Sequence, residues 1–435
     1  MRLELDILNI NDVQFAEKTI IRDRVLYIHR QGLQELLQQD KRLSKVDIEL
    51  AHPGESCRIL QIADVVEPRA KTKGSGEDFP GALGKQGTVG EGNTCVLRGV
   101  AVVINNQSEM HDMPEAEDPM GDIIDMSGPG AELSLYAKTH NVVVLPYPAD
   151  GASPDDYKIA LKIAGLKTAV YLAQAGRELE PDEIEVYDLP PLTELTQGMK
   201  DLPKAAYIFQ VYCTSYPAMV GEPILYGDNI RQLLPIVIHP NEVFDGAIVN
   251  PYHGRGTETY VIQNHPVIKD LYRRHGKELC FVGVVLTVSR YTEPERERSV
   301  AMASNLAKSL FGADGVILTK SSSGAPDIDA AQTAQRCEEM GVKAVLIMFD
   351  GTSPTDLACG MESATVFNLP GAKAIVNTGN FFWQLVSLPA VGRTIGKSVV
   401  LPSGVSADGE LKKALNWISG ALDQEGHSKM VSVRY

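Results

Sequence analysis

The segment DGAIVNPYHGRGTETY, residues 245–260, joins a short apolar run to a loop rich in groups that can act on a substrate. In an active-site interpretation, His253 acts as acid or base and Arg255 holds an anionic group. Glu258 or Tyr260 then orients these two side chains. The polar residues left for substrate contacts in the same segment are Asn250, Tyr252 and Thr257. In the opposite interpretation the loop is solvated and these are ordinary surface residues, which is the commoner case.

Two further polar segments follow predicted strands, TKSSSGAPDIDAAQ at 319–332 and NTGNFFW at 377–383. Hydroxyls and backbone N–H groups at the start of a helix can bind a carboxylate or a phosphate. The candidates are Ser321, Ser322, Ser323, Asn377 and Thr378. We favour a turn for both segments, because Pro326 and Asp327 suit the first turn of a helix.

The sequence gives less support to a metal site or a reactive thiol than to the polar segments above. A metal-dependent lyase or hydrolase could use His239, Glu242, His253 or His265, but their spacing fits no standard ligand pattern. The six cysteines form no CxxC pair and are typical of reduced thiols in a cytoplasm. Cys95 follows a threonine, and such a pair can undergo an N→S acyl shift that ends in a pyruvoyl group. We favour a buried strand residue at this position.

The elements that must position these residues change character along the chain. Residues 1–135 predict a strand-rich region with one helix at 31–39 and a long exposed loop at 71–92. The strands are expected at 2–10, 25–29, 46–50, 57–63 and 96–104. Residues 136–200 predict an α/β segment, with Ser153 as the N-cap of a helix, followed by a linker at 178–203.

Residues 201–435 alternate strands and helices with short connections, which predicts a doubly wound, mostly parallel α/β domain. The strands are expected at 205–213, 233–240, 245–250, 280–288, 313–320, 342–350 and 372–379. The helices are expected at 265–275, 294–311, 326–341 and 411–422. Ligands of such sheets lie beyond the carboxyl ends of the strands, where the polar segments fall.

Composition narrows the class of protein. The chain has 435 residues and a net charge of −15, so it lacks the basic surplus that a nucleic-acid partner requires. The charged, alternating N-terminus predicts no signal peptide, and no apolar run approaches the roughly 18 residues that span a bilayer. We therefore expect a soluble cytoplasmic protein. Neither GxxxxGK[ST] nor GxGxxG between a strand and a helix occurs, so an NTPase and a Rossmann dehydrogenase are not supported.

Long segments carry a family resemblance. Residues 1–28, 52–69 and 123–134 resemble the N-terminal half of the glycine/sarcosine/betaine reductase component B proprotein. The segments that resemble its C-terminal half are 245–249, 264–285, 312–329 and 428–435. The match is collinear over nearly the whole chain.

The resemblance implies a specific chemistry. Members of this family cut themselves at a mid-chain cysteine, which becomes a pyruvoyl group, and the two products stay together. The pyruvoyl carbonyl takes the substrate amine as a Schiff base. A selenocysteine or cysteine on a separate component B subunit then attacks the α-carbon, the amine leaves, and the two-carbon unit passes on as a selenoether.

This sequence departs from the family at the processing position. The cysteine should follow the DGAIV segment, but residues 250–264 read NPYHGRGTETYVIQN and contain neither cysteine nor serine. We therefore expect an uncut chain with no pyruvoyl cofactor, and no other cofactor is expected. A metal has only the weak support described above.

Three interpretations remain open. In the first, the chain is a pyruvoyl-free subunit of an oxidoreductase, in a hetero-oligomer or dimer of heterodimers with a cysteine- or selenocysteine-bearing partner. It binds a small amine- or carboxylate-bearing substrate for cleavage of a C–N, C–S or similar bond. In the second it is a non-catalytic scaffold of that complex, and in the third a metal-dependent lyase or hydrolase. We modestly favour the first, because the replacement loop is polar and aromatic.

Overall fold

The computed structural model describes most of the chain. The described residues are 1–72, 76–85, 87–107, 121–195, 199, 201–211, 234–250, 257–290, 292–321, 324–350, 374–381, 384–397, 404, 406–422, 426 and 431–433. The helices are α1 Arg30–Leu37, α2 Gly128–Leu133, α3 Pro154–Ala173, α4 Pro240–Phe244, α5 Thr259–Gln263, α6 Pro266–Arg274, α7 Glu293–Asn305 and α8 Ala325–Glu339. In this part of the chain no helix is both long and apolar enough to span a membrane.

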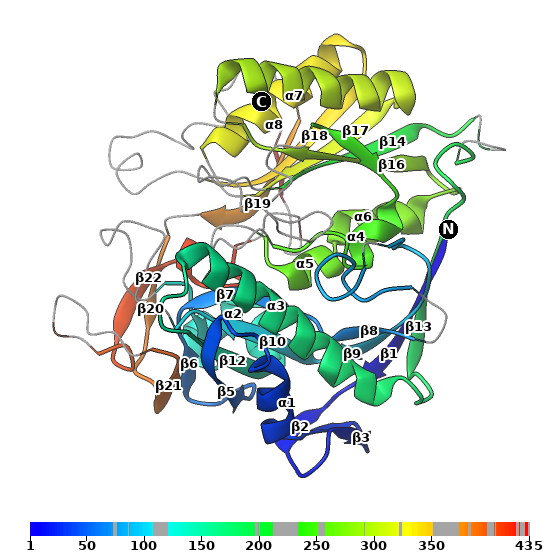
Figure 1. Ribbon diagram of the computed structural model, residues 1–435. Helices are drawn as coiled ribbons and strands as arrows, with labels where there is room; N and C mark the ends of the chain where they lie inside the picture. The colour runs from blue at the N-terminus through cyan, green and yellow to red at the C-terminus, as the bar shows by residue number, and fades with distance from the viewer. Residues whose placement is uncertain are drawn as a thin grey trace.

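The C-terminal half forms the predicted doubly wound sheet. Its seven strands lie in the order β15-β16-β14-β17-β18-β19-β23, with parallel pairing except at the two edge strands. They are β14 Lys204–Val211, β15 Ile236–Ile238, β16 Cys280–Val288, β17 Gly315–Lys320, β18 Lys343–Asp350, β19 Ile375–Phe381 and β23 Val431–Val433. Helices α7 and α8 cover one face, while α4, α5 and α6 lie between the other face and the N-terminal half (Figure 1).

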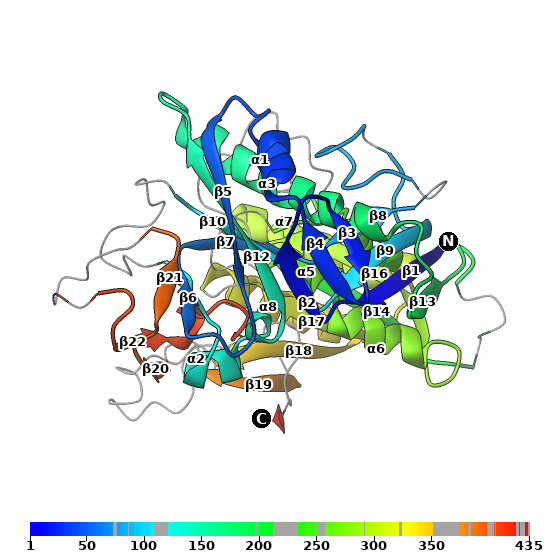
Figure 2. The same cartoon turned by 90° about the horizontal axis from the view of Figure 1, so that it is seen from below.

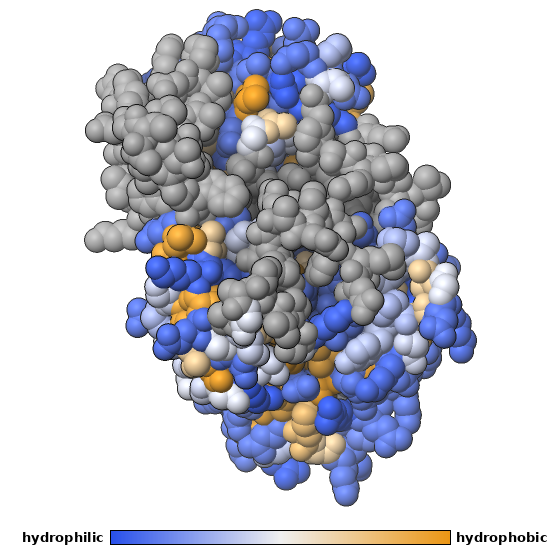
Figure 3. Space-filling view, turned by 90° about the vertical axis from the view of Figure 1, so that its left-hand side faces the viewer, coloured by the Kyte–Doolittle hydropathy of each residue, from blue (hydrophilic) through white to orange (hydrophobic). Residues whose placement is uncertain are grey.

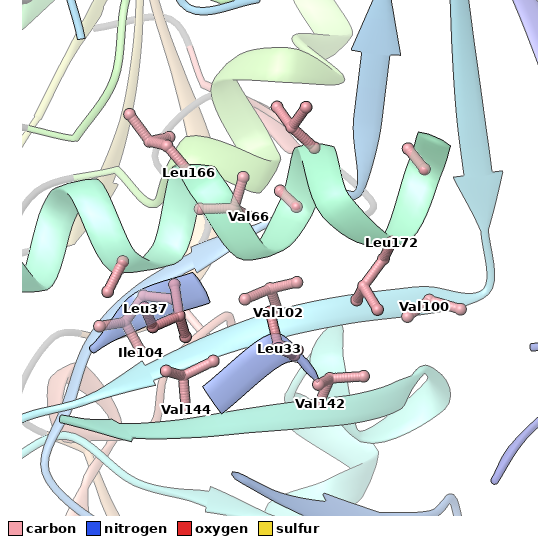
Figure 4. Packing of buried hydrophobic residues seen from close by; sticks show 14 of the residues in the cluster. Leu33, Leu37, Val66, Val100, Val102, Ile104, Val142, Val144, Leu166 and Leu172 are labelled. Carbon is pink, nitrogen blue, oxygen red and sulfur yellow. The ribbon is translucent and has the colours of Figure 1, made fainter. Parts of the chain in front are cut away.

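The N-terminal half is built on two four-stranded sheets, β13-β1-β9-β8 and β5-β12-β10-β7. Their strands are β1 Arg2–Asn9, β5 Leu43–Ala51, β7 Ile62–Val66, β8 Arg69–Lys71, β9 Gly92–Arg98, β10 Val100–Asn105, β12 His140–Pro148 and β13 Glu183–Asp188. Helix α3 packs across the second sheet, where Leu172 points toward Val100 and Val102 (Figure 4). Ser153 caps α3 as predicted, because its side chain accepts a hydrogen bond from the Asp156 N–H at 3.1 Å.

Small sheets complete the molecule and bring the end of the chain back to its beginning. They contain β2 Asp12–Phe15, β3 Ile20–Arg22, β4 Val25–Ile28, β6 Cys57–Ile59, β11 Ile124–Asp125, β20 Leu385–Leu388, β21 Arg393–Ile395 and β22 Leu411–Ala414. Strand β21 pairs with β6, so residues near 393 lie beside residues near 57 (Figure 2). On the face in Figure 3, the described surface is mostly hydrophilic with small, separate apolar patches.

Several predicted elements are wrong. The linker at 178–203 contains β13, an edge strand that pairs only with β1 and leaves Ile184 and Val186 exposed. The helix expected at 411–422 is strand β22 and a short 3₁₀ turn, since pairing with β20 overrides a pattern that fits either structure. The strand expected at 372–379 is β19, which continues to Phe381 through part of the 377–383 segment that was expected as a turn.

Two predicted strands are interrupted, and a third does not form. Residues 96–104 split into β9 and β10 at Gly99, whose φ is +91° and whose missing Cβ would lie 2.5 Å from the Ile10 carbonyl oxygen. Residues 57–63 split similarly into β6 and β7. Residues 245–250 form no strand: Gly246 turns the chain with φ +84° against the Phe79 ring, and the segment lies buried beyond the end of α4.

Candidate functional site

The segment before the 251–256 loop is fixed by a buried carboxylate. Asp245 forms an ion pair with Lys71 on β8, and both side chains are almost fully buried. Its carboxylate also accepts hydrogen bonds from the Gly90 N–H at 2.6 Å and the Thr94 hydroxyl at 3.3 Å. Burial raises the pKa of Asp245, and Lys71 opposes this effect. The aspartate of the DGAIV segment is thus bound to the N-terminal half of the chain.

The segment after the loop is held from both halves of the molecule. The Thr257 and Ser321 hydroxyls lie 2.9 Å apart, which joins this segment to the carboxyl end of β17. On the other side, Thr259 donates to Asp64 on β7 from its backbone N–H at 2.9 Å and from its hydroxyl at 2.6 Å. The Asn250 N–H donates to the Thr259 hydroxyl oxygen at 2.8 Å, which brings the two ends of the loop together.

Glu258 and Tyr260, predicted to orient a catalytic histidine, have structural partners. The Glu258 carboxylate accepts hydrogen bonds from the Ser419 hydroxyl at 2.7 Å and the Gly420 N–H at 3.1 Å. The Tyr260 ring packs edge-on against Tyr136 with 5.5 Å between the centroids. Burial raises the pKa of Tyr260, so its hydroxyl stays protonated at neutral pH.

Asp64 is the titratable group that the sequence analysis missed. It lies in β7 among buried neighbours, and burial raises its pKa to about 7 despite the hydrogen bonds from Thr259. The Glu258 carboxylate acts in the same direction. A carboxyl group that exchanges its proton near neutral pH can serve as a general acid or base. The sequence signal is an acid inside the apolar run IADVV.

A second missed group lies on the sheet face beneath α5 and α6. The Tyr207 hydroxyl lies 2.9 Å from His265 Nε2 and contacts the Thr319 hydroxyl. The His265 ring also packs edge-on against Phe209, 4.8 Å between centroids. These side chains adjoin Ser321 through Thr319, so a hydroxyl-rich, buried region forms where β14 and β17 approach their carboxyl ends.

The remaining predicted residues fall into two groups. Asn377 and Thr378 lie within β19, and the Thr378 side chain is buried. Tyr252, His253, Arg255, Ser322 and Ser323 lie outside the described residues. In the 319–332 segment, the Gly324 N–H donates to the Asp327 carboxylate at 2.7 Å and Lys320 pairs with the same carboxylate at 2.6 Å, as the favoured turn predicts.

The predicted metal ligands do not converge in the described part of the chain. His239 caps α4 with Glu242: the His239 N–H donates to the Glu242 carboxylate at 2.7 Å. Burial lowers the pKa of His239 to about 4, so its ring is neutral. His265 lies with Tyr207, and no group of at least three ligand atoms in the described residues includes any of these side chains. His253 lies outside those residues.

The four cysteines within the described residues do not fit the role of source of a pyruvoyl group. Cys57, Cys95, Cys280 and Cys337 are buried, and burial raises the pKa of Cys57 and of Cys95 to about 12, so these two thiols remain protonated. Cys95 lies in the middle of β9, between β1 and β8, where a chain break would divide a paired strand. The other two cysteines, at 213 and 359, lie outside the described residues.

The fold and site define a class: an α/β protein whose two halves meet at the buried DGAIV segment and at Thr259. Residues 1–432 match the family model of glycine/sarcosine/betaine reductase component B subunits. The chain belongs to this family.

The relatives match along all or nearly all of their length. The chain is 36% identical to glycine reductase complex component B subunits alpha and beta of Acetoanaerobium sticklandii, over all of both chains. It is 35% identical to sarcosine reductase complex component B subunit alpha of Peptoclostridium acidaminophilum, again over all of both chains. Betaine reductase complex component B subunit alpha of the same organism is 29% identical over 94% of this chain and 95% of the relative. No solved structure matches the chain.

Proposed function

We propose that this protein is an uncut, pyruvoyl-free subunit of a component B-like reductase complex. The observation that carries the proposal is the absence of cysteine and serine from residues 250–264, in a chain that otherwise matches the family from end to end. Without that residue the chain has no source of a carbonyl at the family's processing position. The names of the relatives, all component B subunits of reductase complexes, support assembly with other subunits.

In this proposal the chain binds a small amine- or carboxylate-bearing substrate near the loop. A partner subunit supplies a cysteine or selenocysteine that attacks the substrate and cleaves a C–N, C–S or similar bond. His253 serves as acid or base and Arg255 holds the anionic group. Thr257 and Ser321, whose hydroxyls lie 2.9 Å apart, place polar contacts beside the loop, and Asp64 is an additional group for proton transfer.

A scaffold role is the second candidate, and one observation favours it. Glu258 and Tyr260, which should orient the catalytic side chains, have structural contacts instead: Glu258 accepts hydrogen bonds from Ser419 and Gly420, and Tyr260 packs against Tyr136 of the N-terminal half. If the residues on either side of the 251–256 loop only stabilise the fold, the subunit would support a catalytic partner and contribute no reacting group of its own. The metal-dependent lyase has less support, since His239 and Glu242 form a helix cap.

Co-expression with the products of neighbouring genes tests the enzyme proposal. We expect a stable complex with a cysteine- or selenocysteine-bearing subunit that releases an amine or thiol from a small substrate when a dithiol reductant is supplied. His253→Ala and Arg255→Ala should each lower kcat by about 100-fold, while His29→Ala, a change of the same residue type in the N-terminal half, should leave it unchanged. Full activity of both loop variants in an intact complex would favour the scaffold.

A further inference from the structure

Three side chains that are distant in the sequence converge at one end of the second N-terminal sheet. Asp12 is the first residue of β2, His52 follows the last residue of β5, and His140 is the first residue of β12. The two Nδ1 atoms of the histidines lie 2.9 Å apart. Asp12 Oδ1 lies 3.7 Å from Nδ1 of His52 and 3.9 Å from Nδ1 of His140.

The pairing of β5 with β12 sets the positions of His52 and His140. Strands β5 and β12 are antiparallel and pair Ala51 with Asn141, so His52 and His140 continue this register as facing residues. The His140 N–H also donates to the Gly99 carbonyl at 2.9 Å. Both histidines thus extend from a buried sheet, and their rings meet edge to face at 68°. A site built on strands is more precise than one built on a free loop.

Hydrogen bonding explains only part of this arrangement. One proton between the two Nδ1 atoms accounts for their 2.9 Å separation, but 3.7 and 3.9 Å are too long for hydrogen bonds from Asp12. A tetrahedral zinc ion with bonds of about 2.0–2.1 Å has ligand atoms about 3.3 Å apart. The Nδ1 atoms are closer than that value and Asp12 is farther, so the geometry is completed by a slight separation of the two rings and a small inward movement of the Asp12 carboxylate.

The charges and exposure also suit a cation. Each imidazole can offer a ring nitrogen to a metal ion, and the Asp12 carboxylate, which accepts a hydrogen bond from Gln14 Nε2 at 2.6 Å, can add an oxygen ligand. The side chains of Asp12 and His52 are each 38% exposed and that of His140 is 17% exposed, which leaves a path from solvent.

We propose that Asp12, His52 and His140 form a binding site for a divalent transition metal of the zinc type, with the fourth position open to water. Imidazole and carboxylate groups are the ligands that zinc accepts in three-residue sites with an open position. On binding, the proton shared by the two Nδ1 atoms moves to Nε2 of the ring that held it, so both Nδ1 atoms coordinate. The site is independent of the function proposed above, because none of its ligands belongs to the loop or its flanks.

Metal titration of the whole chain tests this proposal. The tag-free protein is stripped with a chelator and titrated with Zn²⁺ by calorimetry at pH 7.5, and with Co²⁺ by visible absorption. We expect one tight Zn²⁺ per chain, tetrahedral Co²⁺ bands, and a rise in Tm of several degrees at about 100 times Kd. His52→Ala and His140→Ala should each weaken Zn²⁺ binding by about 100-fold or more, and Asp12→Asn by about 10-fold.

A matched variant separates this site from general histidine binding. His29→Ala changes a partly exposed histidine of the same half that is not in the cluster, and should leave the affinity and the Co²⁺ spectrum unchanged. His52→Gln repeats the loss of affinity with a polar side chain in case the alanine variant fails to fold, which circular dichroism reports. No tight phase in the wild type, or an equal affinity in His52→Gln, His140→Ala and the wild type, would overturn the proposal.

Discussion

The two flanks of the 251–256 loop are both held by buried aspartates, but in opposite electrostatic ways. Before the loop, Asp245 has a cation in contact, Lys71, together with the Gly90 N–H. After the loop, the flank is held by Asp64, whose hydrogen bonds come from the neutral donors Thr259 and Val65. The first arrangement is a buried ion pair that fixes the fold. The second leaves a carboxyl group with a pKa of about 7, able to change its charge in the physiological range.

The largest expected effect comes from breaking the ion pair. Lys71→Met leaves Asp245 buried without its cation and should lower the free energy of unfolding by about 3–5 kcal/mol. Urea denaturation measures this difference. The double variant Lys71→Met/Asp245→Asn should recover much of the loss, since no uncompensated charge remains.

An exposed pair is the matched control for that experiment. Lys45 and Asp47 lie 2.6 Å apart with the Lys45 side chain 60% exposed. Lys45→Met should cost no more than about 1 kcal/mol, because solvent screens the pair. Similar losses in Lys71→Met and Lys45→Met would show that burial does not distinguish the two ion pairs.

The next largest effect concerns pH and Asp64. Its folded-state pKa of about 7 lies above the ordinary 3.8, so the folded protein holds this proton more tightly than the unfolded chain. The resulting stabilisation is complete below about pH 4 and is lost as the pH rises through 7. Asp64→Asn cannot titrate, so its stability relative to the wild type should improve by about 2–4 kcal/mol between pH 4 and 8.

Denaturation of both proteins across this range measures that change. The comparison uses the difference between the two curves, because other groups titrate equally in both proteins. A difference that stays constant with pH would mean that Asp64 is ionised throughout and that the two flanks do not differ in the way described.

A smaller effect should follow from Thr259→Val. The variant loses the hydroxyl that donates to Asp64 at 2.6 Å and accepts from the Asn250 N–H at 2.8 Å. We expect a loss of about 1–3 kcal/mol and a further rise in the pKa of Asp64, since that hydrogen bond favours the ionised form. Thr168→Val is the control: its buried hydroxyl bonds only a carbonyl of its own helix, so its loss should be smaller and leave Asp64 unaffected.

The smallest effect is expected for Glu258→Gln. The amide oxygen can still accept from Ser419 and Gly420, so stability should fall by less than about 1 kcal/mol. The negative charge of Glu258 raises the pKa of Asp64, so its removal should lower that pKa. The same variant distinguishes a structural from a catalytic role of Glu258. A large loss of activity in an assembled complex of unchanged stability would assign Glu258 to catalysis.

Continuous burial made several strands predictable from the sequence. Strands β16 and β17 were readable because their apolar runs are covered on both faces or nearly so. Strand β13 could not be predicted, because it lies at the edge of its sheet beside β1 and its sequence is polar like that of a linker. The DGAIV segment has the composition of a strand, and only its packing against Phe79 and α4 shows that it is a buried turn.

The site at residues 250–260, identified from polar residue types and family position, stays a prediction. The structure brings together two of the named substrate contacts, because the Thr257 and Ser321 hydroxyls lie 2.9 Å apart. Asp64 required knowledge of what surrounds β7, and its partner Thr259 is 195 residues away. The cluster of Asp12, His52 and His140 depends on the register of β5 and β12, which no local spacing encodes.

Intact-mass measurement of the purified protein, with a test for ketone reactivity, examines the central claim most directly. The account predicts one species at the mass of the full chain, 47.3 kDa, that does not react with a hydrazine. Two fragments that together account for the chain, apart from the ammonia and sulfide released and the water taken up in processing, would contradict it if one had a hydrazine-reactive carbonyl at its new N-terminus.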